Sequence, residues 1–166
     1  MLNRWTENLQ TSKNSNLQPR IFPPVYALGF ALLMWLLHKY IPLTNIITPP
    51  FNNIGFVFIG TGFFIDLWSL ILFFKHKTTF HPLKLEKTEK LVTSGMYKFS
   101  RNPMYLGLLL LLAGWAIMLG SLSAFVPVPL FVLLLNRVQI YHEEKILLEK
   151  FPDKYKEYRA RVRRWF

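Results

Sequence analysis

The chain has 166 residues, of which 52% are hydrophobic, 16% are aromatic and only 17% are charged. A soluble domain usually carries about 25% charged residues, so this composition excludes an ordinary soluble globule as well as a disordered, collagen-like or coiled-coil chain. The chain contains no cysteine, which excludes disulfide scaffolds, thiol nucleophiles and thiolate metal sites.

Four apolar stretches of membrane-spanning length follow a polar N-terminal arm at residues 1–20, which has no apolar stretch of its own and so predicts no cleavable signal peptide. Because about 20 apolar residues cross the roughly 30 Å hydrocarbon layer, we expect an all-α integral membrane protein with four transmembrane helices, at Ile21–Ile41, Ile54–Phe74, Tyr105 to about Leu119, and Leu122 to about Ile140. A turn at Gly120–Ser123 predicts that the last two form a helical hairpin, and Pro127 and Pro129 are expected to kink the last helix.

The basic residues are distributed unevenly, with 20 Lys and Arg against nine Asp and Glu, for a net charge of +11. Nineteen of the 20 lie in the arm, in the segment 75–101 or in the tail from residue 137 onward, and the exception is Lys39. Because basic loops stay cytoplasmic, this pattern predicts a multi-pass protein of the cell membrane with both termini in the cytoplasm. The charge is then explained by topology and by attraction to anionic lipid rather than by nucleic-acid binding.

The segment before the third helix combines several features that suit an anionic ligand. Gly95 permits a turn that other residues resist, and Asn102-Pro103 starts a turn just before the helix. The helix N-terminus and Arg101 both favour negative charge, and nearby tyrosines add flat faces and hydroxyl groups. The alternative is that Arg101 and the tyrosines only anchor the helix at the headgroup level.

The tail predicts two further helices. Ile146, Leu147 and Phe151 recur at helical spacing, Pro152 breaks the pattern, and Asp153 is expected to cap a second helix with Tyr155, Tyr158 and Val162 on one face. At the start of this tail, Glu143 and Glu144 place two carboxylates beside a membrane helix. They either hold a cationic group or belong to a solvated helix face.

Asp66 lies in the middle of the second apolar stretch. A carboxyl group inside a bilayer costs about 2.5–3.5 kcal/mol on insertion scales, so such residues favour a functional hypothesis. The alternative is a protonated or helix-paired Asp66 bonded to Thr61 or Ser69. The histidines are scattered and form no metal-ligand pattern, so we expect no metal site; they are His38, His76, His81 and His142.

Two stretches resemble a known family. The sequence PLKLEKTEKLVTSGMYKFSRNPMYLG and the closing EEKILLEKFPDKYKEYRARVRRWF are similar to the signatures of the isoprenylcysteine carboxyl methyltransferase family and its small bacterial relatives, including phospholipid N-methyltransferase-like proteins. The resemblance covers about residues 77–166, which we take as the methyltransferase core, after transmembrane helices one and two at residues 21–76.

The resemblance implies an integral-membrane enzyme that uses S-adenosylmethionine, bound in a cytoplasmic pocket built from the loop before the hairpin and the helices after it. The acceptor would be a lipophilic or lipidated molecule that enters from the bilayer among membrane lipids. Matching positions imply that the cofactor is bound by Leu91, Val92, Gly95, Tyr97, Asn102, Pro103, Met104, Tyr105 and Glu143.

We assign catalytic roles to Arg101 and Glu144, and substrate-binding roles to Gln139 and Arg137. Many family members carry an arginine four residues before the cofactor-binding glutamate, where this chain has Gln139, and its nearest arginine is Arg137. Glu144 is rotated by about 100° from Glu143 on a helix, so we expect it to point elsewhere and to pair with basic residues of the loop.

The acceptor stays open at this stage: a prenylcysteine carboxylate, a lipid amine, and a small hydrophobic thiol or phenol all fit. Two broader alternatives also remain. One is a non-catalytic membrane binding protein, and the other is a nicotinamide-dependent sterol or steroid reductase with a similar tyrosine-rich tail.

Overall fold

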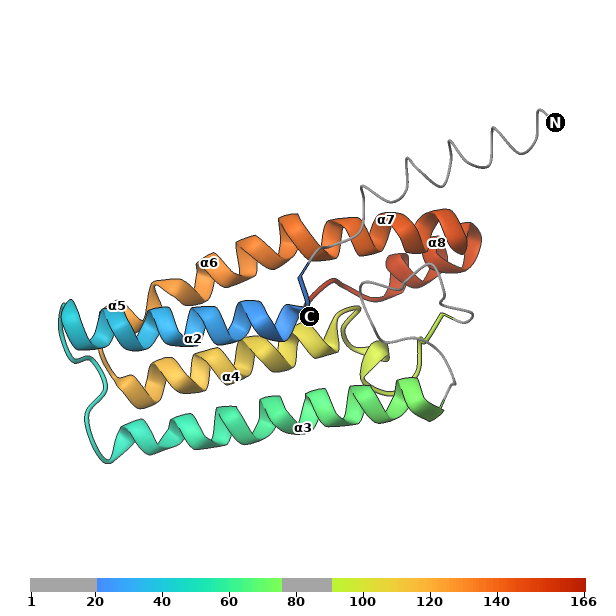
Figure 1. Cartoon of the computed structure of the whole chain (residues 1–166). Helices are drawn as coiled ribbons and strands as arrows, with labels where there is room; N and C mark the ends of the chain where they lie inside the picture. Colours follow the sequence, from blue (N-terminus) through green and yellow to red (C-terminus); the bar gives the residue numbers. More distant parts are fainter. Residues whose placement is uncertain (1–20, 76–90) are drawn as a thin grey trace.

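The computed structural model describes residues 21–75 and 91–166. Expectations for the arm 1–20, for His76 and His81, and for the first part of the family motif fall outside these ranges. Within them the chain is helical, and its long helical segments lie side by side with alternating direction (Figure 1).

The helices occupy the positions that the apolar stretches predict. In chain order the elements are α2 Pro23–Tyr40, η1 Phe51–Asn53, α3 Ile54–Lys75, η3 Gly95–Lys98, α4 Pro103–Leu119, α5 Leu122–Phe125, α6 Pro127–Leu134, η4 Leu135–Ile140, α7 Tyr141–Lys150 and α8 Pro152–Arg161. Proline occupies the first turn of α2, α4, α6 and α8, where its missing N–H group costs nothing.

Two expectations for the second half of the hairpin are wrong. The last apolar helix does not end near Ile140 but continues through a π-helical turn, η4, and through α7 to Lys150. It continues because no proline or glycine occurs between Ile140 and Pro152. Asp153 does not cap α8, since Phe151 occupies the N-cap position and Pro152 the first helical position; Asp153 lies in the first turn instead.

Among the described residues, two helices are long and apolar enough to cross a membrane, Phe51–Leu72 and Leu122–Lys150, and Pro103–Leu119 is a shorter apolar helix. Large apolar side chains cover the outer surface of α2 and α3 and stay exposed in the isolated chain, among them Leu28, Leu32, Phe56, Val57, Phe63 and Phe64. An apolar exterior of this kind suits contact with lipid tails.

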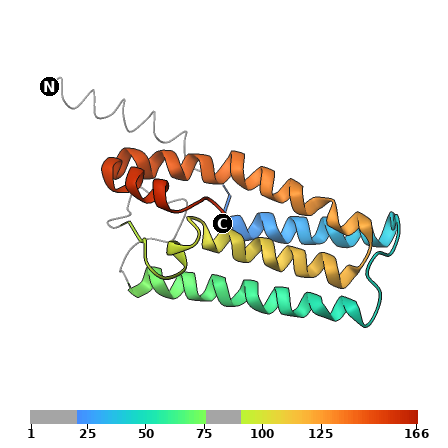
Figure 2. The same ribbon diagram turned by 180° about the vertical axis from the view of Figure 1, so that it is seen from behind.

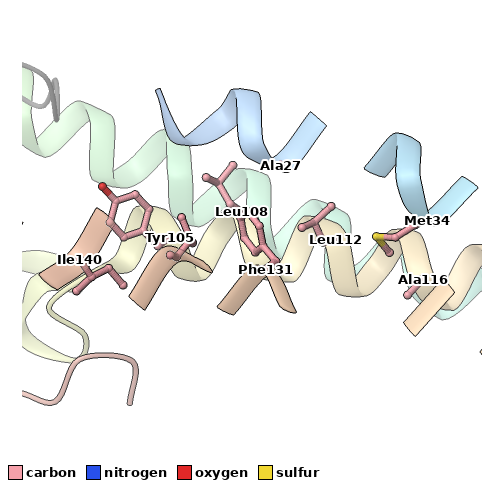
Figure 3. Packing of buried hydrophobic residues seen from close by; sticks show 9 residues of the cluster. Ala27, Met34, Tyr105, Leu108, Leu112, Ala116, Phe131 and Ile140 are labelled. Atoms are coloured by element: carbon pink, nitrogen blue, oxygen red, sulfur yellow. The ribbon is translucent and has the colours of Figure 1, made fainter. Parts of the chain in front are cut away.

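Helix α4 lies at the centre of the bundle and buries two different faces. One face carries Leu108, Leu112 and Ala116, which pack with Met34 of α2 and Phe131 of α6 into the main apolar cluster (Figure 3). Phe30 meets the edge of the Phe131 ring with centroids 5.3 Å apart. The other face of α4 packs against α3 over most of its length.

The α3–α4 contact is made by glycines in register. Gly55 and Gly62 on α3 are seven residues apart, as are Gly107 and Gly114 on α4, so each pair lies on one helix face. A Cβ atom at Gly62 would lie 2.6 Å from the Gly107 carbonyl oxygen, and one at Gly114 would lie 2.6 Å from that of Gly55. The two backbones therefore touch directly, as in packed membrane helices.

The loop after α2 and the hairpin turn close one end of the bundle. Gly120 has φ +73°, and its carbonyl oxygen accepts hydrogen bonds from the backbone N–H groups of Ile46 and Ile47 at 2.9 and 3.1 Å. His38 Nδ1 lies 2.9 Å from the Ser121 hydroxyl. These hydrogen bonds tie the loop after α2 to the hairpin turn, and the opposite end of the bundle carries the charged residues described next.

We expect Gly62→Val to force α3 and α4 apart and to lower the free energy of unfolding by about 1–3 kcal/mol, the usual cost of overpacking. Gly60→Val is the matched control, because Gly60 lies in the same helix and has open space where a Cβ would stand. Thermal unfolding of both variants in detergent measures the difference. Equal melting temperatures would contradict direct backbone packing.

Candidate functional site

Two regions distant in sequence, each made of two elements, meet at the end of the bundle opposite Gly120. One is η3 with the N-terminus of α4, and the other is the α7–α8 pair with the C-terminal tail, residues 162–166 (Figure 2). Asn102 occupies the N-cap position of α4 and Pro103 its first turn, so the helix begins two residues before the expected Tyr105. Gly95 has φ +60° at the start of η3, and a Cβ there would collide with Leu72 of α3.

Glu143 lies at the buried centre of this region. Its Oε1 atom accepts a hydrogen bond from the hydroxyl of Tyr105 on α4 and another, at 2.6 Å, from Nε2 of Gln139. Gln139 is fully buried and lies in the π-helical turn that precedes α7. Such turns often occur at functional sites, and here the turn leads directly into the helix that carries both glutamates.

Glu144 lies next to Glu143 in the same region and binds two guanidinium groups. Arg164 donates to both carboxylate oxygens, at 3.1 Å from Nε and 2.6 Å from Nη2. Arg101 Nη1 lies 3.2 Å from Oε1, and the Arg101 and Glu144 side chains are only 9% and 11% exposed. The expected pairing of Glu144 with a basic residue of the loop is therefore confirmed for Arg101.

The C-terminal tail is tied to the N-terminus of α4 by its backbone as well. The Arg101 N–H donates to the Arg163 carbonyl oxygen at 3.0 Å, and Ser100 Oγ and Asn102 Nδ2 donate to that of Arg164 at 3.2 and 3.1 Å. Trp165 Nε1 donates to Asn136 Oδ1 at 3.2 Å. Hydrogen bonds thus join the motif before α4 directly to the closing motif of the chain.

Three tyrosines besides Tyr105 line this region, and each has a raised hydroxyl pKa. Burial raises the pKa of Tyr97 well above its usual value of 10, with further increases from Tyr158, Glu143 and Asp66. Burial also raises the pKa of Tyr155 to about 12 and that of Tyr158 above its usual value. The Tyr158 hydroxyl donates to the Tyr97 carbonyl oxygen at 2.6 Å and so fixes η3 against α8.

Several buried polar atoms in or near this region have no hydrogen-bond partner among the described residues. They are Nε of Arg101, Oε1 of Gln139, Nδ1 of His142, Oδ1 of Asp66 and Oγ of Ser69. The alternative in which Asp66 bonds to Thr61 or Ser69 is not observed, because the Thr61 hydroxyl donates to the Val57 carbonyl oxygen at 2.8 Å. Unpartnered groups of this kind are rare in folded proteins and mark places where a ligand can bind.

The structure brings together most of the residues singled out from the sequence. Val92, Tyr97, Pro103, Tyr105, Gln139, Glu143 and Glu144 are buried, and Leu91, Gly95, Arg101, Asn102 and Met104 are partly buried. Arg137 is exposed, although it lies only two residues before the buried Gln139. Sequence reasoning missed Arg164 and Asn136 as partners. The sequence signal that pointed to Arg164 was the pair of adjacent carboxylates at Glu143 and Glu144, because such a pair needs cationic partners.

Comparisons with known proteins identify the family of the chain. The model of the phospholipid methyltransferase family matches residues 51–154. A 62-residue stretch is 47% identical to an uncharacterised protein of Haemophilus influenzae, covering 37% of this chain and 98% of that protein. Over 111 residues the chain is 29% identical to protein-S-isoprenylcysteine O-methyltransferase B of Arabidopsis thaliana, covering 67% of this chain and 56% of that enzyme.

A third relative is methanethiol S-methyltransferase 1 of Bradyrhizobium diazoefficiens, which is 34% identical over 111 residues, covering 65% of this chain and 37% of that enzyme. The long apolar helices and these relatives define a helical membrane protein of the methyltransferase class. The chain belongs to the phospholipid methyltransferase family. This confirms the resemblance inferred from the two motifs, although the chain spans about half or less of the length of these named methyltransferases.

We expect Glu144→Gln to destabilise the fold, because it leaves two guanidinium groups without their shared carboxylate. Breaking a buried ion pair costs about 3–5 kcal/mol. Glu149→Gln, at an exposed position of the same helix, should change the free energy of unfolding by less than about 0.5 kcal/mol. Chemical unfolding in detergent, with hydrogen exchange of residues 162–166, measures both effects, and an unchanged tail in Glu144→Gln would refute this role.

Proposed function

We propose that the chain is an integral-membrane methyltransferase that uses S-adenosylmethionine and acts on a lipophilic acceptor. The observation that carries the proposal is that Arg101 and Glu143, from motifs on either side of the helical hairpin, lie in one buried polar region at one end of an apolar bundle. In this proposal residues 77–166 form the methyltransferase core, and residues 21–76 supply two supporting helices.

The proposed topology has four membrane spans with both termini in the cytoplasm. It is supported by the alternating direction of α2, α3, α4 and the α5–α7 helix. It is also supported by the segregation of basic residues toward the end that carries the polar region. The shorter spans, α2 and α4, would cross the bilayer with help from their flanking residues.

The residues present fit the cofactor. S-adenosylmethionine carries a carboxylate, an ammonium group, a sulfonium and an adenine ring. The unpartnered N–H of Arg101 suits the carboxylate, and the buried Glu143 suits the ammonium group. The protonated tyrosines, Tyr97 foremost, offer faces for the adenine ring and for the sulfonium. Leu91, Val92, Gly95, Asn102, Pro103, Met104 and Tyr105 complete this proposed binding set.

When bound, the cofactor supplies a methyl group on a positively charged sulfur. The chain's own task is to hold the acceptor in line with that methyl group and to keep water out. Tyr105 and Gln139 fix the orientation of the Glu143 carboxylate by donating to it. The described residues include no group of three possible metal ligands, and the proposal assigns no role to a metal.

Three residues take roles outside the cofactor-binding set. Both oxygens of Glu144 are occupied by guanidinium groups, so we assign it a positioning role, in which it holds Arg101 toward the cofactor. Gln139 borders the acceptor side of Glu143. The exposed Arg137 would extend to the headgroups of surrounding lipids, as long basic side chains do at membrane surfaces.

We expect the purified protein in detergent to bind S-adenosylhomocysteine, the demethylated cofactor, and Glu143→Gln to weaken that binding. A charged hydrogen bond contributes about 1.5–3 kcal/mol, so the affinity should fall roughly 10- to 150-fold. Titration calorimetry measures the affinity, with Glu149→Gln as control. No detectable binding to the wild-type protein would rule out the cofactor proposal.

The topology can be tested with reporters fused after Phe166. We expect a fluorescent protein there to mature and alkaline phosphatase there to be inactive, because the tail carries nine of the 20 basic residues and should stay in the cytoplasm. A fusion at the loop between α2 and α3 should give the reverse result. Phosphatase activity at the C-terminus would exclude the proposed orientation.

A further inference from the structure

Asp66 is a carboxylate inside the bundle that the proposed cofactor site does not use. Helix α3 places it against α4, where a Cβ at Gly107 would collide with the Asp66 carboxylate. Only glycine therefore leaves room for the carboxylate at that point of α4. The Oδ1 atom is buried without a partner among the described residues, while the residue as a whole is only half-buried.

Ser69 adds a second unmet polar atom on the same face of α3. It follows Asp66 by three residues, which places the two side chains one above the other on the helix. Ser69 is fully buried, and its hydroxyl also has no partner among the described residues. A carboxylate oxygen only accepts hydrogen bonds and a hydroxyl oxygen can accept them, so this pair suits a group that is rich in donors.

The pair adjoins the proposed cofactor site on its membrane side. Gly107, which faces Asp66, is two residues further into α4 than Tyr105, about 3 Å deeper along the helix. Asp66 is also one of the charges that act on Tyr97. Toward the cytoplasm, α3 continues to Trp68 and Leu72, which border Gly95. A lipid that enters from the bilayer would meet Asp66 before it reaches Glu143.

We propose that Asp66, together with Ser69, binds the head of the methyl acceptor and selects a lipid amine over a carboxylate. This inference rests on the proposed function and deepens it. An ammonium group has three N–H donors and no acceptor, which matches two unmet oxygen atoms. An acceptor carboxylate would place a second negative charge beside Asp66. Gln139, which is the neutral side chain beside Glu143, adds no positive charge to offset it.

The same carboxylate can take the proton that the amine must lose. An ammonium nitrogen has no free lone pair, so it cannot accept a methyl group until one proton leaves. Transfer of that proton to Asp66 Oδ1 turns the ammonium into a neutral amine and the carboxylate into a carboxylic acid. One hydrogen moves, the nitrogen keeps its electron pair, and the net charge of the two groups is unchanged.

The test uses the full chain in detergent with two probes that share one alkyl chain, dodecylamine and dodecanoate. A ligand that binds the folded state raises the melting temperature according to its affinity. We expect dodecylamine to stabilise the wild-type protein more than dodecanoate does. In Asp66→Asn the apparent affinity for the amine should fall at least 10-fold, and the preference for amine should disappear.

Asp153→Asn is the matched control, because Asp153 is an exposed carboxylate in α8, and it should keep the preference. Equal amine preference in Asp66→Asn and the wild type would overturn the proposal. Binding of S-adenosylhomocysteine is measured in parallel and should be unchanged in Asp66→Asn. Failure of the wild-type protein to bind S-adenosylhomocysteine would count against the proposed function. An amine preference that is the same in Asp66→Asn as in the wild type would count only against the role of Asp66.

A second measurement needs no variant and decides the matter if Asp66→Asn does not fold. Dicyclohexylcarbodiimide is apolar and modifies carboxyl groups in apolar surroundings, and peptide mass spectrometry separates Asp66 from Glu143. We expect modification of Asp66, with protection by dodecylamine and not by dodecanoate. Equal protection by both probes, or no modification at all, would show that Asp66 does not meet an amine from the bilayer.

Discussion

Glu144 holds the polar end of this protein together, because two guanidinium groups from opposite ends of the motif region share its carboxylate. Arg101 comes from the segment before α4, and Arg164 comes from the tail after α8. The same contact brings the backbone of residues 163 and 164 against Ser100 and Asn102. A charge shared in this way is stable in a buried place only while both partners stay. The fold of the loop and the fold of the tail are therefore mutually dependent.

The neighbouring glutamates have different partners because consecutive residues of a helix are rotated by about 100°. The π-helical turn lies between the apolar part of the last span and α7, and it places the buried Gln139 beside Glu143. Glu143 faces Tyr105 inside the bundle, while Glu144 faces the guanidinium groups of Arg101 and Arg164. On the other side of α4, the glycine contacts bring α3 close enough for Asp66 to border the same region. A tightly packed hairpin and an irregular turn thus arrange carboxylates at different depths.

The positions of the helices could be predicted from the sequence, because apolar stretches and proline at first turns are local signals. The turn at Gly95 could be predicted too, because glycine permits a positive φ. The contact of Glu144 with a basic residue of the loop could be predicted because a pair of adjacent carboxylates needs a cation. The break at Pro152 could be predicted as well, because proline ends the helical pattern of the tail. The continuity of the last span with this tail helix could not be predicted, because the chain changes from apolar to polar at Ile140. The bidentate contact of Arg164 and the burial of Gln139 also escaped prediction. Both depend on tertiary packing that no spacing in the sequence records.

The helical segment from Leu122 to Lys150, made of α5, α6, η4 and α7, has 29 residues and so measures about 43 Å, against a hydrocarbon layer of about 30 Å. Its apolar start is fixed at the closed end of the bundle, so Glu143 falls about 32 Å along the axis, at the far boundary of the hydrocarbon. A rigid helix cannot shorten, and a thicker bilayer would draw its polar end into the acyl chains or change its tilt. Hydrophobic mismatch with the surrounding lipid would therefore set how far the glutamates lie from water. The acyl-chain length of the host membrane would in this way influence the chemistry of these carboxylates.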